Sequence, residues 1–340
     1  MSPVWYISLI IIPIFLWGYG MFTGVKRWVF EAFNLRKHGA LPNLVVGNLS
    51  AGGSGKTPMV LFLLESFVNQ KIGVLSRGYG RKTRGFFKVN EDSTFVDVGD
   101  EALEIFNHQK QTPVYVCEDR LEGLEQIYND KKVDWVILDD GYQHLRLSAN
   151  KSVILTPFNR PFWEERFCLP VGNLREFKNA ATFANAVIIT KCPSELTKEE
   201  AQLYLKDCRL DTLHIFFAHY RQSEPRALYN ESQEKRALLV TGIAQKEGLD
   251  ESILGWDIVD YIPYSDHHEF SERDVHFWLK TCRDKSVNSL IVTRKDLQRI
   301  QNNGLISILL EEKISIYEIH IDVEILWNQK DDLLKLIHPC

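Results

Sequence analysis

The stretch GNLSAGGSGKTP at residues 47–58 constrains the fold more than any other feature of the chain. It follows the apolar run 44–46, and three glycines, one lysine and one threonine lie within its residues 52–57. Glycines leave the backbone free to turn its N–H groups toward phosphate oxygens, a lysine reaches the outer phosphates of a nucleotide, and a threonine hydroxyl can hold Mg²⁺. The stretch therefore predicts a strand, a phosphate-binding loop and the start of a helix, whose first turn suits Pro58.

The residues predicted to bind the nucleotide are those of the loop and the start of the helix: Ser50, Ala51, Gly52, Gly53, Ser54, Gly55, Lys56 and Thr57. A strict form of this motif has glycine at position 50, where the chain has serine. The alternative is a glycine-rich turn without a ligand. A strand, a loop, Gly-Lys-Thr and a helix in that order are more specific than such a turn, so we predict a nucleotide with Mg²⁺. Lys56 is also predicted to be catalytic, because charge neutralisation dominates phosphoryl transfer.

A second carboxylate-bearing segment, VDWVILDDGYQH, occupies residues 133–144. Its first part is aliphatic enough for a buried strand, and Asp139 and Asp140 follow where that strand would end. Ligands of open α/β sheets lie at the carboxyl ends of the strands. We therefore predict Thr57, Asp139 and Asp140 as metal ligands, with one aspartate binding the ion and the other anchoring the loop. The alternative is a pair of solvated aspartates at a turn, which Gly141 permits.

Short apolar runs alternate with helical patterns along most of the chain, which is typical of a parallel sheet between helices. The expected strands are 44–47, 73–76, 114–117, 133–139, 152–155 and 187–190, then 237–241, 258–262, 289–293 and 315–319. The expected helices are 57–69, 100–107, 121–129, 197–208 and 271–284. The polar segment 217–235 indicates a linker. We predict an α/β fold in three parts: an N-terminal membrane helix with its basic flank (1–36), a P-loop core (37–222) and a smaller α/β domain (223–340), the last two facing each other across a cleft.

The N-terminus is unusual, because residues 4–22 contain no charged side chain. A run of about 20 apolar residues is long enough to cross a bilayer. Four lysines and arginines against one glutamate over residues 23–39 favour a cytosolic location for the remainder of the chain. A signal peptide would need a basic segment before the run and a small-residue cleavage site after it, and both are missing. We predict a membrane anchor; whether it spans or lies in one leaflet is left open, since Pro13 also fits an interfacial helix.

Composition excludes several other classes of protein. The chain has 340 residues and a net charge of −5, which argues against a nucleic-acid binder. Its six cysteines form no C-x-x-C pair, so a zinc site or a disulfide framework is not expected.

Five blocks together resemble the tetraacyldisaccharide 4′-kinase family of lipid A biosynthesis. They are GNLSAGGSGKTP, GDEA (99–102), DDGYQH (139–144), LPVGNLRE (169–176) and SDHHEF (265–270), and they occur in the family's order over nearly the whole chain. The resemblance implies transfer of the γ-phosphate of ATP to the 4′-hydroxyl of an acylated glucosamine disaccharide 1-phosphate. It also implies a membrane-associated protein on the cytoplasmic face of the bacterial inner membrane.

The same resemblance implies roles for residues that spacing alone does not assign. It makes Asp100 the catalytic base, partnered by His267 of the second domain; from the residues alone, Asp100 suits a helix N-cap equally well. It makes Glu176 a further metal-side carboxylate and Arg175 a phosphate clamp, with Asn173 beside them. Two positions depart from the family. Tyr142 stands where leucine or phenylalanine is common, and Arg294 replaces a glutamate in the usual TEKD, so we carry over no role for that position.

A basic loop, SRGYGRKTR, follows the second expected strand at residues 76–84. Four cations in this loop suit an anionic lipid headgroup, and we predict Arg77 and Arg81 as substrate-binding residues, together with Asn173, Arg175 and His144. A solvated basic turn is the alternative.

The main rival function is a membrane-bound P-loop switch, either a GTPase or a partner-regulating ATPase. Guanine recognition usually needs an Asp after Thr-Lys-x, but the segment ITKCPSE has Pro193 there. This argues against a GTPase and leaves an ATPase switch as an alternative. A non-catalytic scaffold is disfavoured because Lys56, Thr57 and both aspartates are present.

Overall fold

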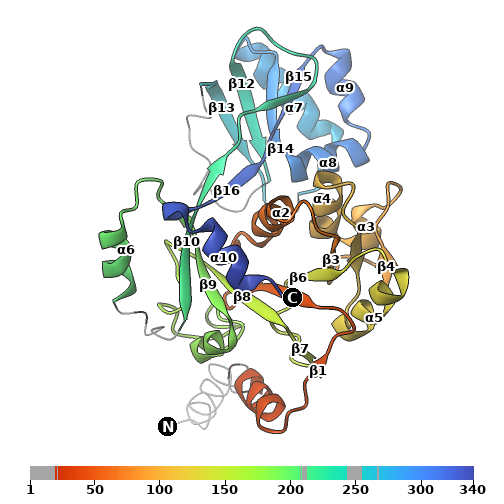
Figure 1. The fold of residues 1–340 in the computed structure, drawn as a ribbon. Helices are drawn as coiled ribbons and strands as arrows, with labels where there is room; N and C mark the ends of the chain where they lie inside the picture. Colours follow the sequence, from red (N-terminus) through yellow and green to blue (C-terminus); the bar gives the residue numbers. More distant parts are fainter. Residues whose placement is uncertain (1–19, 21, 207, 209–212, 243–254, 266–267) are drawn as a thin grey trace, which may run out of the picture. The chain divides into compact units, whose positions relative to one another are not determined.

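A computed structural model describes residues 20, 22–206, 208, 213–242, 255–265 and 268–340 of the protein. The described residues form two compact units (Figure 1). The first comprises the chain up to His219 together with Val323–Cys340, and the second is Tyr220–Asp322.

The first unit is built on a nine-stranded sheet with the order β16-β10-β9-β8-β2-β6-β3-β5-β4. From β10 to β5 all neighbouring strands are parallel, and β4 is antiparallel to β5. The strands are β2 (Asn43–Asn48), β3 (Ile72–Ser76), β4 (Phe87–Lys88), β5 (Val114–Val116), β6 (Trp135–Asp139), β8 (Lys151–Pro157), β9 (Ala186–Cys192), β10 (His214–Gln222) and β16 (Ile321–Ile325). A separate parallel pair joins β1 (Lys37–His38) to β7 (Leu147–Ser148).

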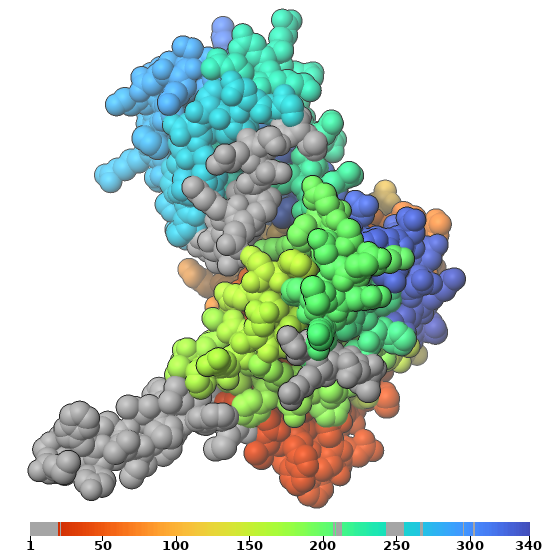
Figure 2. Space-filling view, turned by 90° about the vertical axis from the view of Figure 1, so that its left-hand side faces the viewer, coloured from red at the N-terminus to blue at the C-terminus, as the bar shows by residue number. Residues whose placement is uncertain are grey.

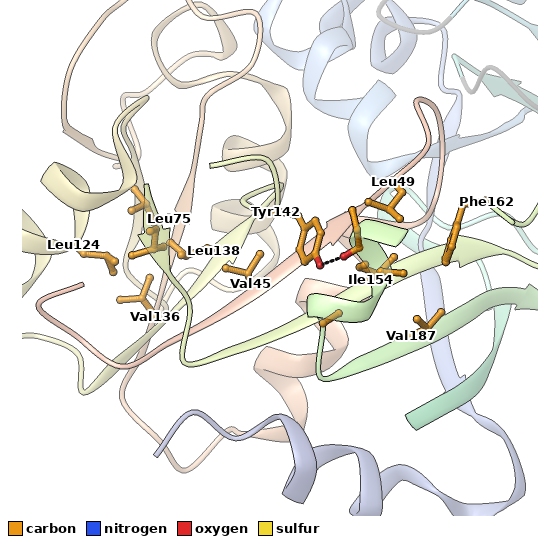
Figure 3. Packing of buried hydrophobic residues seen from close by; sticks show 14 of the residues in the cluster. Val45, Leu49, Leu75, Leu124, Val136, Leu138, Tyr142, Ile154, Phe162 and Val187 are labelled. Atoms are coloured by element: carbon orange, nitrogen blue, oxygen red, sulfur yellow. Dashed lines mark hydrogen bonds between the residues drawn. The ribbon is translucent and has the colours of Figure 1, made fainter. Parts of the chain in front are cut away.

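Helices connect the parallel strands, as such strands require. They are α2 (Lys56–Ser66), α3 (Phe95–Val98), α4 (Asp100–His108), α5 (Arg120–Asp130), α6 (Lys198–Leu205) and the C-terminal α10 (Lys330–Ile337), with two short 3₁₀ segments, η1 (Lys178–Phe183) and η2 (Leu326–Asn328). All residues of β2, β3 and β6 are buried, which explains their continuous apolar runs. Figure 3 shows the core beside them, where Val45, Leu75 and Leu138 pack and the Tyr142 hydroxyl donates to the carbonyl of Ala180 at 2.6 Å.

The second unit has a five-stranded sheet with the order β11-β15-β14-β12-β13, parallel except for β11. Its strands are β11 (Arg226–Tyr229), β12 (Arg236–Thr241), β13 (Asp257–Pro263), β14 (Ser289–Thr293) and β15 (Ser315–Ile319), and its helices are α7 (Glu272–Asp284), α8 (Arg294–Asn302) and α9 (Ile306–Glu311). Trp278 of α7 is fully buried in its core. An α/β fold with parallel sheets in both parts is confirmed, and every strand expected from the sequence is present.

Two expectations about chain organisation are wrong. The expected linker 217–235 contains most of β10 and all of β11, whose mixed polar pattern comes from strands with exposed positions. The last 18 residues belong to the first unit, not to the C-terminal domain. The reason is packing: Leu333 and Ile337 of α10 are buried, and the His338 ring contacts Phe67 and Trp135.

The predicted membrane segment, residues 4–22, lies almost entirely outside the described residues. In the part of the chain that the structure covers, we find no helix with the length and apolar character needed to span a bilayer. A helix over residues 22–32 directly follows the segment. It exposes Phe22, Val25 and Trp28 and buries Arg27. Figure 2 shows this helix, in red, at the surface of the molecule.

Candidate functional site

The predicted phosphate loop lies between β2 and α2, at the centre of the larger sheet. Gly52 and Gly55 have φ angles of 102° and 78°, which side chains rarely adopt, so the glycines are needed where they stand. Asn48 shapes the loop from beneath, because its Nδ2 donates to the Ser50 carbonyl at 2.7 Å and to Ser54 Oγ at 2.9 Å. Gly52 and Gly53 are exposed, whereas Ser50 and Ser54 are buried.

The N-terminus of α2 points out of this loop without a cap of its own. Helix α2 begins at Lys56, and its N-cap Gly55 has no side chain to accept a hydrogen bond. The first N–H groups of a helix need a partner and attract anions. The loop therefore has the geometry expected of a phosphate site, built from the residues predicted for it.

Segment 173–175 braces the loop from one side. The Ala51 N–H donates to the carbonyl of Asn173 at 2.6 Å, and the Arg175 N–H donates to the carbonyl of Leu49 at 2.7 Å. The side chain of Asn173 is itself occupied, since Nδ2 donates to Glu165 Oε1 at 3.2 Å. On the other side, Thr190 Oγ1 donates to the Ser54 carbonyl at 3.0 Å. The loop is thus tied to two neighbouring segments of the first unit.

Asp140 pairs with two cationic side chains of the predicted site. Its carboxylate lies 3.7 Å from Lys56 Nζ, and Arg175 Nη1 donates to both of its oxygens at 2.9 Å. Burial alone would raise the pKa of Asp140, but the charges of Lys56 and Arg175 outweigh it and lower the pKa overall. Asp140 is therefore a carboxylate at neutral pH, and it holds Lys56 at the mouth of the loop.

Asp139 is in the opposite situation. It is fully buried, its Oδ2 accepts a long hydrogen bond of 3.4 Å from Ser76 Oγ, and its Oδ1 has no hydrogen-bond partner. Burial, and then the charges of Glu101 and Asp140, raise its pKa to about 8, against the opposing influence of Lys56 and Arg120. An orphaned buried carboxylate oxygen is costly unless a ligand satisfies it. A cation beside the loop would supply that partner.

Arg120 is a buried residue of the site that the sequence did not reveal. It starts α5, and its guanidinium donates to the carbonyls of Cys117 at 2.6 Å and Asp139 at 3.2 Å. Burial lowers its pKa to about 10. Nothing in its local pattern distinguishes it from a surface arginine at a helix start. Ser76, which ends β3 and donates to Asp139, is likewise not distinguished by its local sequence.

Asp100 is the first residue of α4, and the N-cap is Gly99, so the N-cap alternative for Asp100 is wrong. Its neighbour Glu101 contributes to the raised pKa of Asp139, which indicates that the start of α4 lies near the end of β6. The proposed partner His267 lies outside the described residues. The adjacent His268 lies 3.3 Å from Asp274 and packs against Tyr264.

The remaining predicted substrate residues divide into two groups. Arg77 is exposed and His144 is partly buried. Burial lowers the pKa of His144 to about 4, and the nearby Arg120 adds to this effect. Arg81 instead turns inward: its side chain is 2% exposed, and it pairs with Glu118 at 2.8 Å and donates to the Gly85 carbonyl. Its contacts are those of a residue that shapes the loop 77–85.

Glu176, expected as a metal ligand, pairs with an arginine. Both of its carboxylate oxygens accept hydrogen bonds from Arg27, so the structure gives no support to its expected role as a metal ligand. No set of three or more His, Cys, Asp and Glu side chains that could hold a metal occurs among the residues the structure covers. Of the other predicted metal ligands, Asp139 ends β6 beside β2, Asp140 lies 3.7 Å from Lys56 Nζ, and Thr57 is partly buried at the start of α2.

Comparison with known proteins gives a consistent result. A family model described as tetraacyldisaccharide-1-P 4′-kinase matches residues 8–338. The tetraacyldisaccharide 4′-kinase of Cytophaga hutchinsonii is 33% identical over 98% of this chain and 95% of its own length. That of Bacteroides thetaiotaomicron is 32% identical over 93% of this chain and 88% of its own. Among solved structures, LpxK from Aquifex aeolicus in complex with ATP has the same fold, with a TM-score of 0.72, 22% identity and 98% of each chain covered.

Proposed function

The chain belongs to the tetraacyldisaccharide-1-P 4′-kinase family, and from this premise we propose how its site carries out the transfer. It is a lipid A 4′-kinase, which transfers the γ-phosphate of ATP to the 4′-hydroxyl of a tetraacyl glucosamine disaccharide 1-phosphate. The observation in the site that carries the proposal is the ion pair between Lys56, the first residue of α2, and Asp140, which directly follows β6. The strand β2 that leads to α2 is the neighbour of β6, and α2 has no side-chain cap.

In our proposal the triphosphate occupies residues 50–57. The N–H groups of the loop and of the first turn of α2 bind its oxygens, and Lys56 neutralises the charge that develops as the γ-phosphate departs. Asp140 and Arg175 hold Lys56 and the entry of the loop in position. A preorganised loop needs no rearrangement at the moment of transfer, which is the main source of catalysis in phosphoryl transfer.

Mg²⁺ fits the oxygens present at the loop. The Thr57 hydroxyl and one of Asp139 and Asp140 would hold it, and Asp139 has an orphaned oxygen for such a role. When bound, the ion neutralises charge on the phosphates. A small hard cation prefers one or two protein carboxylates with water and phosphate oxygens, so a cluster of three acidic ligands is not required.

Asp100 is the proposed general base. It begins a helix, whose N-terminal dipole favours negative charge, and Glu101 beside it acts electrostatically on the end of β6. A base must reach the sugar hydroxyl whose proton it accepts. His267 is the proposed partner of Asp100 on the strength of family resemblance.

Membrane association at the cytoplasmic face of the inner membrane is a further part of the proposal. It is supported by the uncharged segment 4–22 and by the exposed apolar side chains of Phe22, Val25 and Trp28 on the adjoining helix. Such a surface suits an enzyme whose acceptor has acyl chains. Arg77 and the exposed cations of its loop are proposed to face the anionic headgroup.

The test is a transfer assay with the full chain in detergent, γ-labelled ATP and either tetraacyl disaccharide 1-phosphate or water as the acceptor. We expect label in the lipid and a much slower release of phosphate to water. Phosphate release that ignores the lipid and responds to a protein partner would favour the ATPase switch.

A further inference from the structure

A buried ion pair joins the helix over residues 22–32 to the segment that braces the phosphate loop. Arg27 Nε donates to Glu176 Oε2 at 2.5 Å, and Arg27 Nη2 donates to Glu176 Oε1 at 2.9 Å. Both residues are almost fully buried, at 5% and 3% exposure. The same Nη2 donates to the carbonyl of Tyr142 at 3.3 Å, and the guanidinium lies 4.9 Å from the centre of the Tyr142 ring. One arginine therefore holds two segments that both lead to the site.

Those two segments converge on Asp140 and the loop. Tyr142 is two residues after Asp140, and Glu176 directly follows Arg175, which donates to both Asp140 oxygens. The backbone around Arg175 in turn carries the hydrogen bonds to Leu49 and Ala51 at the start of the loop. A shift of Glu176 would therefore move the adjacent Arg175, which contacts both the loop and Asp140.

Stability alone does not explain this pair. Replacing a buried ion pair by apolar side chains is often neutral or stabilising, because both charges must leave water. A forked guanidinium on a carboxylate supplies a defined geometry, which apolar packing does not. The neighbouring residues Phe22, Val25 and Trp28 on the same helix are exposed, so the helix presents apolar side chains outward and one charged anchor inward.

We propose that Arg27 is a positioning residue for phosphoryl transfer. It holds Glu176 and Tyr142 in place. Through them it positions the Arg175 side chain against Asp140 and the backbone of segment 173–175 against the phosphate loop. Through this junction the position of the 22–32 helix is coupled to the geometry of the loop. The inference rests on the kinase function proposed above, and it adds a residue that neither touches the nucleotide nor lies in the phosphate-binding motif. Small misplacements of reacting groups are sufficient to slow an enzyme, even when they originate far from the chemistry.

The test uses the full chain in detergent and the variants Arg27→Met, Glu176→Met and the double variant. The matched control is the double variant Arg294→Met and Glu318→Met, which removes another largely buried arginine–glutamate pair, in the second unit. We expect each single variant of the 27–176 pair to melt at a lower temperature, because it leaves one buried charge unpaired. The double variant should melt close to the parent, with kcat about tenfold below that of the control and KM for ATP and lipid changed by no more than about twofold.

A double variant that recovers the kcat of the control together with its melting temperature would overturn the proposal, since the pair would then act only through stability. If the double variant does not fold, the variant Arg27→Lys tests the proposal, because lysine keeps the positive charge but cannot make the two-pronged hydrogen bond to Glu176. A lowered kcat in that variant, at parental KM, supports the proposal, and a parental kcat refutes it. No transfer by the parent protein would refute the kinase function instead.

Discussion

Each of the two units contains a strand that leads into a helix, and the two helices differ in whether a side chain caps their N-terminus. In the second unit, β14 leads directly into α8, and the N-cap Thr293 accepts from the Asp296 N–H at 3.2 Å and donates to Asp296 Oδ2 at 2.6 Å. In the first unit, the glycine-rich residues 49–55 separate β2 from α2, and no side chain caps the helix. A side chain of the protein therefore caps α8, whereas α2 has no side-chain cap.

Two buried aspartates show the same contrast. Asp296 is 1% exposed and its Oδ2 also accepts from the Gly242 N–H at 2.8 Å. Asp139 is equally buried, but its Oδ2 accepts a long hydrogen bond of 3.4 Å from Ser76 Oγ, whereas Asp296 also lies 3.8 Å from the buried Arg299. Both are expensive to bury, and the protein compensates Asp296 with shorter hydrogen bonds than those it gives Asp139. In the function proposed above, a phosphate and a cation are the groups that would meet the start of α2 and the carboxylate of Asp139.

The largest effect should come from removing the positive charge of Lys56 at the start of α2. We expect Lys56→Ala to lower kcat by about 10³-fold, roughly 4 kcal/mol, since the lysine neutralises charge that develops in the transition state. The transfer assay measures this, and the same exchange at the exposed Lys71 is the control. Full activity of Lys56→Ala would remove the functional distinction between the two helix starts.

The second prediction exchanges each buried aspartate for asparagine. An ordinary aspartate has a pKa of about 4, so between pH 4 and the raised pKa of about 8 the folded protein keeps a proton on Asp139 that the unfolded chain has released. Stability conferred by that proton is lost as pH rises through this window. At pH 8 Asp139→Asn should therefore be more stable than the parent, with a free energy of unfolding at least about 1 kcal/mol higher. The variant should also lose transfer activity.

Asp296→Asn should do the reverse. It weakens an acceptor whose Oδ2 holds hydrogen bonds of 2.6 and 2.8 Å, so we expect a loss of about 1–3 kcal/mol in stability. Urea unfolding of the metal-free proteins at pH 8 compares the two variants. A loss of stability in both would mean that Asp139 is as well compensated as Asp296.

The third prediction concerns two glycines with similar backbone angles. Gly55 and Gly304 have φ of 78° and 69°. Alanine at either position should cost about 1–2 kcal/mol of stability, because its Cβ is strained at positive φ. Only Gly55→Ala is expected to weaken ATP binding, by about tenfold, which titration calorimetry can measure. Equal ATP affinity in both variants would show that the loop tolerates a side chain at its last glycine.

The smallest effect is a pH dependence confined to the first unit. The lowered pKa of His144, about 4, means that the folded protein keeps this ring neutral while the unfolded chain takes up a proton near pH 6.5. Stability is therefore lost as pH falls from about 6.5 to 4, and His144→Gln should remove about 1 kcal/mol of that loss. Hydrogen exchange should show the difference in β6 and α5 and not in α7. An unchanged pH slope in β6 and α5 would contradict the prediction.

The strands of both sheets could be predicted because their sequence signal is local. Buried parallel strands such as β2 and β6 are continuous apolar runs, and the chain must alternate them with helices to connect them. The segment around β10 and β11 was misjudged because partly exposed strands have no such run. The return of α10 to the first unit could not be predicted, since it depends on which apolar surface is free to receive Leu333 and Ile337.

At the site, the sequence by itself determined the loop, Lys56, Thr57 and the two aspartates, because a glycine-rich turn and carboxylates at a strand end are needed wherever this chemistry occurs. It also determined the family, through the order of its motifs. Only the tertiary structure decided that Asp139 and Asp140 have opposite electrostatic environments, that Arg81 and Glu176 turn to partners within the protein, and that Arg120 and Arg27 hold the site from behind. Burial and pairing depend on which segments the fold brings together, such as Arg27 and Glu176, which are 149 residues apart, and no local pattern encodes which side chains will meet.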